Sequence, residues 1–268
     1  MSINIFQIFY SDLTKNQNDH GFLQLDNLAN DRPDWREYWP IRKFLIENQL
    51  NSDDYYGFFS PKFMQKTGLG SKDVFEFIQS REGDAFLFSP FFDQSAFPMN
   101  VLEQSAAQHK DLQSTIEESF RLLDPSINAS TILMNSSNTI FCNFFVAKKK
   151  FWDTWLTYCE LIFSIAEKND SALGRSLNAN TNHDGGLAPA KVFVIERVAS
   201  FIFSTQSQWK VHAFNPMALP YANSHVAKFK DELCILDSLK VAYSKNNFSD
   251  YLRIYNKVRS DIIKQLQL

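Results

Sequence analysis

Short apolar runs alternate with helical patterns along the chain, and this alternation constrains the fold more than any other feature. Residues 3–10, 55–61 and 84–90 are rich in Phe, Ile and Tyr. Ser-Asp follows the first range and Ser-Pro closes the other two, as happens where buried strands meet a loop. Apolar residues at helical spacing lie between them, over 34–46 and 71–79. Strands that alternate with helices predict an α/β domain whose mixed, mainly parallel sheet is flanked by helices.

The second half of the chain continues this pattern and ends in helices. The predicted elements are a strand over 139–146, a helix over 149–167, a helix over 192–203, a short strand over 209–214 and two or more amphipathic helices over 224–266. We therefore expect residues 1–222 to form the main domain and residues 223–268 to form a helical C-terminal cap. Two polar segments, 16–34 and 168–189, are expected to be surface loops. The second has the length of a functional lid, and disorder without function is its simpler interpretation.

Composition narrows the class of protein. The 268 residues carry 27 Lys+Arg and 30 Asp+Glu, a net charge of −3, without the basic block that supplies most nucleic-acid affinity. Nucleic acid is therefore excluded as the main partner. Cys142, Cys159 and Cys234 lie in apolar runs without C-x-x-C spacing and are expected to be reduced core thiols. No basic leader and no apolar stretch of ~18–20 residues occurs, so we expect a cytoplasmic protein. The 26 Phe residues predict a Phe-rich core.

Polar side chains follow the first three predicted strands. The chain has no P-loop, G-x-G-x-x-G or G-x-S-x-G motif and no paired His at metal-binding spacing. Other α/β proteins bind nucleotides in the crevice outside the carboxyl ends of the strands. There, Gln7 and Tyr10 could contact a base, Lys62 could neutralise a diphosphate, and Asp93 with Gln94 could hold a hard cation. An ordinary solvated lysine and a turn-forming aspartate are the competing interpretations.

Several segments resemble known proteins, and they occur in the same order. They are IFQIFY at 5–10, DWREYWPIR at 34–42, DYYGFFSPKF at 54–63, NFFVAK at 143–148 followed by FW at 151–152, and F-x-x-E-R at 193–197. They resemble bacterial proteins encoded among polysaccharide-biosynthesis genes and, more distantly, capsular-polysaccharide glycosyltransferases of the GT-A type. The similarity spans residues 3–205.

The resemblance implies a GT-A-like, Rossmann-like nucleotide-sugar-binding and catalytic domain over residues 1–222. It implies transfer of a sugar, a hexose in the expected case, from a nucleotide donor, UDP-sugar being favoured, to a glycan or lipid-linked acceptor. The pathway would be assembly of a cell-surface polysaccharide such as O-antigen (lipopolysaccharide) or capsule, with peripheral association at the inner face of the membrane. The segment at 60–62, Ser-Pro-Lys, stands where the family has His-Tyr-Arg-Arg, which reduces the positive charge expected at the phosphate site.

The resemblance also implies a divalent ion, Mn²⁺ or Mg²⁺, which such enzymes hold with D-x-D. No D-x-D occurs in this chain, and Asp93 is the best-placed replacement. Candidates for the catalytic base are Asp93, Asp184 and Glu196. Lys62, Arg42 or the ion would stabilise the diphosphate.

Each remaining candidate has a structural alternative. Asn143, predicted to lie mid-strand, could bond a sugar hydroxyl or satisfy neighbouring backbone. Glu196 could form a buried ion pair with Arg197 in place of a catalytic role. Arg42 could pair with Glu37 on its own helix.

Two other functions remain open from the sequence. One is a catalytically inactive nucleotide- or carbohydrate-binding module on the same fold, which the missing D-x-D favours. The other is a partner subunit whose C-terminal helices dock another protein.

Overall fold

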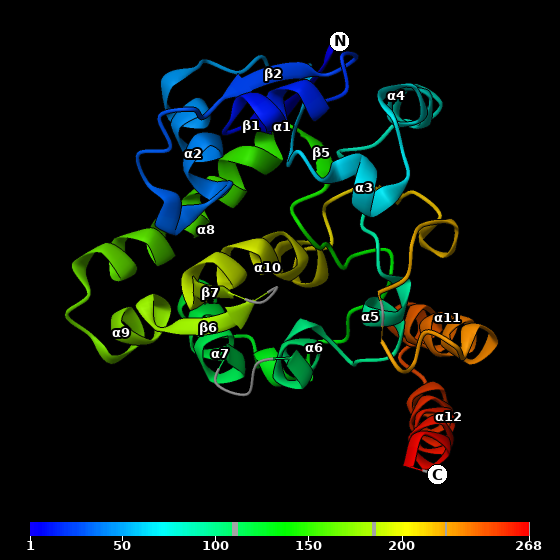
Figure 1. Cartoon of the computed structure of the whole chain (residues 1–268). Helices are drawn as coiled ribbons and strands as arrows, with labels where there is room; N and C mark the ends of the chain where they lie inside the picture. The colour runs from blue at the N-terminus through cyan, green and yellow to red at the C-terminus, as the bar shows by residue number, and fades with distance from the viewer. Residues whose placement is uncertain (109–111, 184–185, 223, 268) are drawn as a thin grey trace.

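A six-stranded sheet organises the chain (Figure 1). The computed structural model describes residues 1–108, 112–183, 186–222 and 224–267. Within them the sheet has the order β2-β1-β3-β5-β4-β8. Its strands are β1 (Ile3–Phe9), β2 (Leu23–Asp26), β3 (Tyr55–Phe59), β4 (Ala85–Leu87), β5 (Phe145–Lys148) and β8 (Val211–Ala213).

The sheet is mixed and mainly parallel, as predicted. β1 pairs in parallel with β2 and β3, and β4 pairs in parallel with β8. β5 lies between β3 and β4 and is antiparallel to both, so it runs against the other strands. The parallel register sets Phe6 opposite Phe58. The carboxyl ends of β1 and β3 therefore meet at the same edge of the sheet.

Helices connect and flank the strands. They are α1 (Asp12–Gln17), α2 (Tyr38–Glu47), α3 (Phe63–Thr67), α4 (Ser71–Gln79), α5 (Phe92–Ala96), α6 (Val101–Gln108), α7 (Leu112–Leu123), α8 (Lys149–Lys168), α9 (Ala172–Asn178), α10 (Ala190–Thr205), α11 (Lys230–Asn246) and α12 (Ser249–Gln267). Short 3₁₀ turns occupy Pro33–Trp35, Ala129–Thr131 and Pro216–Ala218, and β6 (Asn180–His183) and β7 (Gly186–Pro189) pair as a hairpin.

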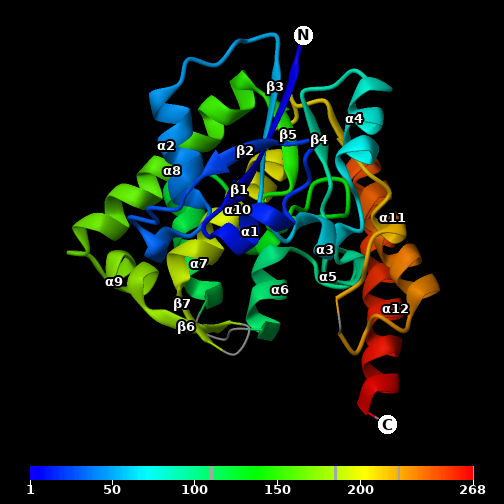
Figure 2. The same ribbon diagram turned by 45° about the horizontal axis from the view of Figure 1, so that its top comes forward.

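Successive strand residues point to opposite faces of the sheet, and each face has its own helices (Figure 2). On one face Phe58 meets Trp152 of α8 edge to face, in a core shared with α2. On the other face Phe59 stacks on Phe63 of α3, with 4.0 Å between ring centroids, in a core shared with α4. The predicted Phe-rich core is confirmed on both faces.

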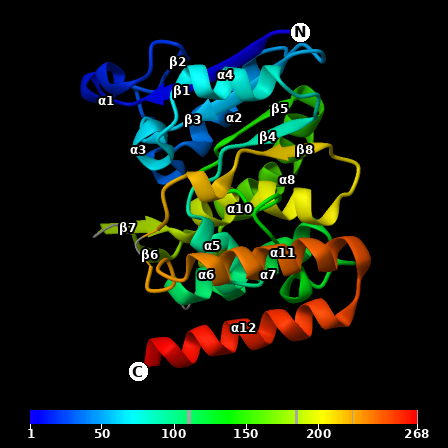
Figure 3. The ribbon, with the colours of Figure 1, turned by 90° about the vertical axis from the view of Figure 1, so that its right-hand side faces the viewer.

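The C-terminal helices form a third layer beside α5 (Figure 3). Phe92 of α5 packs with Leu233 of α11 and Tyr255 of α12 in a separate buried cluster. Both helices were predicted from the amphipathic pattern over 224–266. The described residues contain no helix that combines the length and apolar character needed to cross a bilayer.

Three predicted elements need correction. The strand over 139–146 is wrong in position, because Cys142 and Asn143 adopt φ of 61° and 55° and so turn the chain just before β5. The apolar residues ahead of β5 are buried in a loop. The segment 16–34 contains the edge strand β2, and the segment 168–189 contains α9 and the β6–β7 hairpin rather than a long loop.

Candidate functional site

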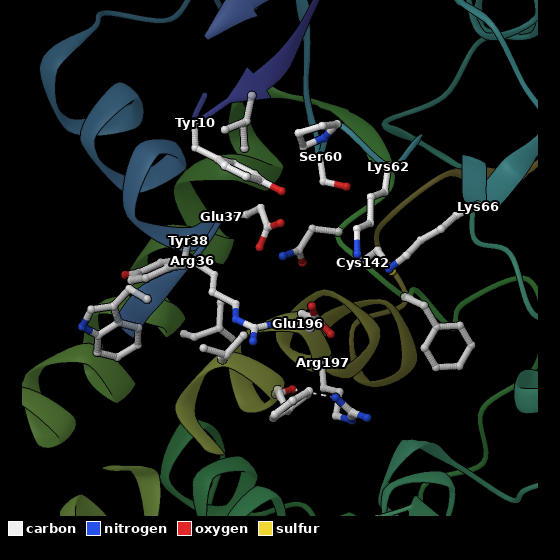
Figure 4. Close-up of a pocket in the computed structure, with 18 of the residues that line it drawn as sticks. Tyr10, Arg36, Glu37, Tyr38, Ser60, Lys62, Lys66, Cys142, Glu196 and Arg197 are labelled. Atoms are coloured by element: carbon white, nitrogen blue, oxygen red, sulfur yellow. Dashed lines mark hydrogen bonds between the residues drawn. The ribbon is translucent and has the colours of Figure 1, made fainter. Parts of the chain in front are cut away.

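A cavity of about 530 Å³ opens at the carboxyl ends of β1 and β3. Tyr10 follows β1 directly, and Ser60 follows β3. Further walls come from the turn between the first 3₁₀ helix and α2, from α3 and its preceding residue, from the turn at 141–143 and from α10. Figure 4 shows these groups around one hollow. Thus the predicted convergence of the first two strand ends is found in the structure.

Three cationic side chains extend toward this hollow (Figure 4). Lys62 and Lys66 come from one segment, since Lys62 precedes α3 and Lys66 lies one turn further on. Arg36 comes from the opposite side, where it has φ 45° and ψ −131° at the end of the 3₁₀ helix. A non-glycine residue rarely adopts that conformation, and such strain gathers at functional sites.

Lys66 is half-buried, whereas Lys62 is exposed. Its Nζ donates to Cys142 Sγ at 3.0 Å. Burial alone would lower the pKa of Lys66, but Cys142 and the carboxylates of Glu196 and Glu37 outweigh burial and raise that pKa above its usual value. Burial also raises the pKa of Cys142 to about 11, so the thiol stays neutral and Lys66 stays charged.

Two carboxylates, Glu37 and Glu196, share the cavity with the cations. Glu196 projects from α10 toward the hollow (Figure 4). Burial raises the pKa of Glu196, and the positive charges of Arg197 and Lys66 offset this only in part. A carboxyl group with a raised pKa in a cleft is a candidate for a general acid or base.

The charges of the cavity are not paired with one another. Across the described ranges, Arg36, Lys62, Glu37 and Glu196 form no side-chain hydrogen bond or ion pair, and Lys66 contacts only a thiol. Arginines on the adjoining helical surface are fully paired. Arg42 forms a forked contact with Glu160 of α8 at 2.5 and 2.8 Å. Arg32 bonds both Asp34 and Glu167. Charged groups left unpaired around a hollow are arranged for a ligand rather than for stability.

A buried amide adds an unused acceptor. Asn143 is 4% exposed and lines the cavity, and its Oδ1 has no hydrogen-bond partner in the structure. A buried polar atom without a partner is rare in folded proteins. Since the turn at 142–143 brings Asn143 to the wall, the predicted contact with a ligand hydroxyl remains available to it.

Arg197 lines the cavity, but its guanidinium group is hydrogen-bonded to residues of α6 and to its own helix. It donates to Ser105 Oγ at 2.8 Å, to the Phe193 carbonyl at 2.8 Å and to Gln104 Oε1 at 2.9 Å. It points away from the hollow (Figure 4), and burial lowers its pKa. The ion pair with Glu196 that the sequence allowed is not present. Gln104 in turn donates to Gln94 at 3.0 Å, and both glutamines line the cavity.

Three predicted site residues lie elsewhere. Gln7 is buried and bridges the strand ends, because its Nε2 donates to the Ser60 carbonyl and its Oε1 accepts from the Asp19 amide. Arg42 forms an ion pair with Glu160 and does not extend into the cavity, and the pairing with Glu37 that the sequence allowed is not formed. Neither residue lines the hollow.

Asp93 also does not line the cavity. It is fully buried at the start of α5 and accepts hydrogen bonds from the Ala222 amide at 2.8 Å and from the Ser224 hydroxyl. It therefore anchors the segment that leads to the cap, whereas its neighbour Gln94 reaches the cavity. The remaining candidate, Asp184, lies outside the described residues.

The described residues form no ready-made side-chain cage for Mn²⁺ or Mg²⁺. Such ions take several oxygen ligands from carboxylates and carbonyls. The described part of the chain has no group of three His, Cys, Asp or Glu placed to share a metal, and the oxygens of Asp93 are already engaged.

Sequence reasoning missed Arg36 and Glu37 as cavity residues. They stand in the DWREYW segment, but nothing in the pattern indicates that the helix begins only at Tyr38, which leaves both side chains in a turn. Cys142 was expected in the core, and the turn that exposes it to Lys66 follows no glycine or proline signal.

No protein-family model and no curated protein sequence matches the chain. Among solved structures, the chain is similar to WbbM, described as a bifunctional glycosyltransferase in its apo form, with 15% sequence identity and a TM-score of 0.44. The match covers 84% of this chain and 46% of that one, so this chain spans less than half the length of WbbM.

Proposed function

We propose that this protein is a glycosyltransferase that moves a sugar, a hexose in the expected case, from a nucleotide-sugar donor to a glycan or lipid-linked acceptor. The cavity at the carboxyl ends of β1 and β3, with its unpaired cations and carboxylates, carries the proposal. The segments that resemble GT-A glycosyltransferases support it, because each lends a residue to the cavity wall: Tyr10, Arg36, Lys62, Asn143 and Glu196. A GT-A type of fold over residues 1–222 belongs to the same proposal.

The donor half of the cavity is the cationic side. Arg36, Lys62 and Lys66 are placed to neutralise the diphosphate that leaves during transfer. The half-exposed ring of Tyr10 stands at the end of β1, where it can stack on a base. UDP is the nucleotide we favour. Asn143 Oδ1 would accept a hydrogen bond from a sugar hydroxyl.

The acceptor half contains the base. Glu196, whose carboxyl pKa is raised by burial, would take the proton of the acceptor hydroxyl as its oxygen forms a bond to the anomeric carbon. The bond from that carbon to the diphosphate oxygen breaks, and the diphosphate leaves with the electron pair. Glu37 is a second carboxylate among the described residues that line the cavity, and it would orient the acceptor or the sugar.

Donor binding followed by turnover tests the proposal. The protein is titrated with UDP-, GDP-, CMP- and dTDP-sugars in thermal-shift and calorimetric assays, and nucleotide release is then measured. We expect one nucleotide family to stabilise the fold and to be released slowly by water. Glu196→Gln should lower turnover while preserving donor affinity. Glu76→Gln on α4, with an exposed carboxylate far from the cavity, is the matched control. Absence of binding by every donor contradicts the proposal.

A catalytically inactive nucleotide- or carbohydrate-binding module is the second candidate. The absence of D-x-D from the sequence, and of a carboxylate cluster from the described residues, favours this candidate. Binding of one donor without nucleotide release, with or without Mn²⁺ and across acceptor glycans, would assign the chain to this class. A role in O-antigen or capsule synthesis at the cytoplasmic face of the membrane is part of the enzyme proposal, because lipid-linked acceptors are presented there.

A further inference from the structure

We propose that the cavity neutralises the donor diphosphate with its own side chains, Arg36, Lys62 and Lys66, and needs no divalent ion to do so. This inference rests on the proposed function and concerns its donor site. It departs from the Mn²⁺ or Mg²⁺ requirement that the GT-A resemblance implies.

The first support is the state of the three cations. Each extends toward the hollow, and within the described chain none has a carboxylate within salt-bridge distance. The cations Arg32, Arg42 and Lys191, which are also buried or half-buried, are paired, since each forms ion pairs with one or two carboxylates. The cavity cations are therefore available to an anionic ligand.

Lys66 gives the second support, because its half-buried ammonium group forms no ion pair among the described residues. Its one hydrogen bond goes to the neutral thiol of Cys142, and a thiol is a weak acceptor. Removing a cation from water without pairing it is costly. A phosphate oxygen beside Lys66 would supply the missing negative charge, which makes this side of the cavity selective for polyanions.

The third support is the placement of the acidic residues. Among the described residues, Glu37 and Glu196 are the carboxylates that line the cavity, and Asp93, the predicted metal ligand, bonds Ala222 and Ser224 at the junction of α5 with the C-terminal segment. Among the described residues, a divalent ion at this wall would meet the repulsion of three cations beside the carboxylates of Glu37 and Glu196. The donor set of the described residues therefore favours direct contact between the phosphates and the lysines.

Binding of UDP and of inorganic pyrophosphate, measured by calorimetry in EDTA and again with Mn²⁺, tests the inference. We expect both probes to bind in EDTA and Mn²⁺ to leave the affinity unchanged. Lys62→Met and Lys66→Met should each weaken binding roughly tenfold, since a hydrogen bond to a charged group is worth that much. Lys72→Met on α4, an exposed lysine away from the cavity, should bind as the unaltered protein does.

Lys62 is exposed, so its substitution leaves the fold intact. For Lys66→Met, whose side chain is half-buried, thermal melting shows whether the variant is folded. The inference is overturned if UDP binds only with Mn²⁺, or if Lys62→Met and Lys66→Met retain full affinity in EDTA. Sugar transfer that strictly needs Mn²⁺ would overturn the inference and leave the glycosyltransferase proposal standing. UDP binding that needs the two lysines but no metal, without any sugar transfer, would support the inference and contradict the glycosyltransferase proposal.

Discussion

Lys240 holds the C-terminal cap on the domain through a cation that the fold encloses completely. It lies on α11 with 0% exposure, and its Nζ donates to the carbonyls of Ser95 and Pro98. Burial is the main cause that lowers the pKa of Lys240 from 10.5 to about 7, while the nearby charge of Asp237 opposes the shift. A neutral amine still has two N–H donors for the two carbonyls.

This shift makes the stability depend on pH. Between about pH 7 and 10.5 the unfolded chain binds a proton at Lys240 that the folded chain does not, so the free energy of unfolding rises with pH. Below pH 7 both states are protonated, and the full cost of burying the ammonium is present. From pH 7 to 9 this linkage adds about 2 kcal/mol to the free energy of unfolding.

Urea unfolding at pH 7, 8 and 9 measures this effect in the unaltered protein and in Lys240→Met. The variant lacks the titrating group, so its stability relative to the unaltered protein should fall by about 2 kcal/mol from pH 7 to 9. Lys245→Met, on the exposed end of the same helix, is the control and should keep the original pH profile. Parallel pH profiles for Lys240→Met and the unaltered protein would refute the assigned cause.

Three further predictions concern the sheet and the site. Gly57→Ala places a Cβ 2.7 Å from Val146 Cγ2 between β3 and β5, so it should lower the melting temperature, with about 1–3 kcal/mol lost; unchanged melting would mean that β5 shifts freely. Asp93→Asn weakens the acceptor for Ser224 and should cost about 1–3 kcal/mol in urea unfolding, with UDP affinity intact; loss of metal-assisted binding instead would restore its predicted role. Turnover of the unaltered protein should rise with pH as Glu196 loses its proton, at a pKa above the usual carboxyl value; Glu196→Gln should lack this acidic limb, and an identical limb in the variant would point to another group.

The spacing of apolar residues predicted those helices and strands that are long enough to show a clear periodic pattern. The helix found at Lys149–Lys168 and the strand at Ile3–Phe9 agree closely with their patterns. The short edge strand Leu23–Asp26 was missed because two alternating leucines among polar residues resemble a loop. The strand predicted over 139–146 was misplaced because a buried loop and a buried strand have the same apolar composition.

The site was predictable only where it depends on strand ends. Tyr10 and Lys62 reach the cavity because parallel strands end at one edge of the sheet. The positions of the Arg42 and Asp93 side chains depend on partners far along the chain. Glu160 is 118 residues from Arg42, and Ser224 is 131 residues from Asp93. No local sequence pattern shows which distant residue a charged side chain will contact. A residue that pairs with a distant partner therefore cannot be distinguished, from sequence, from one that binds a ligand.

Three consecutive residues of the five-residue helix α5 serve different parts of the molecule. Asp93 fastens the segment entering the cap, Gln94 stands in the cavity wall, and the carbonyl of Ser95 receives Lys240. Helix α11 therefore contacts the same short helix that supplies Gln94 to the cavity wall. One short helix thus joins the C-terminal helices to the wall of the cavity.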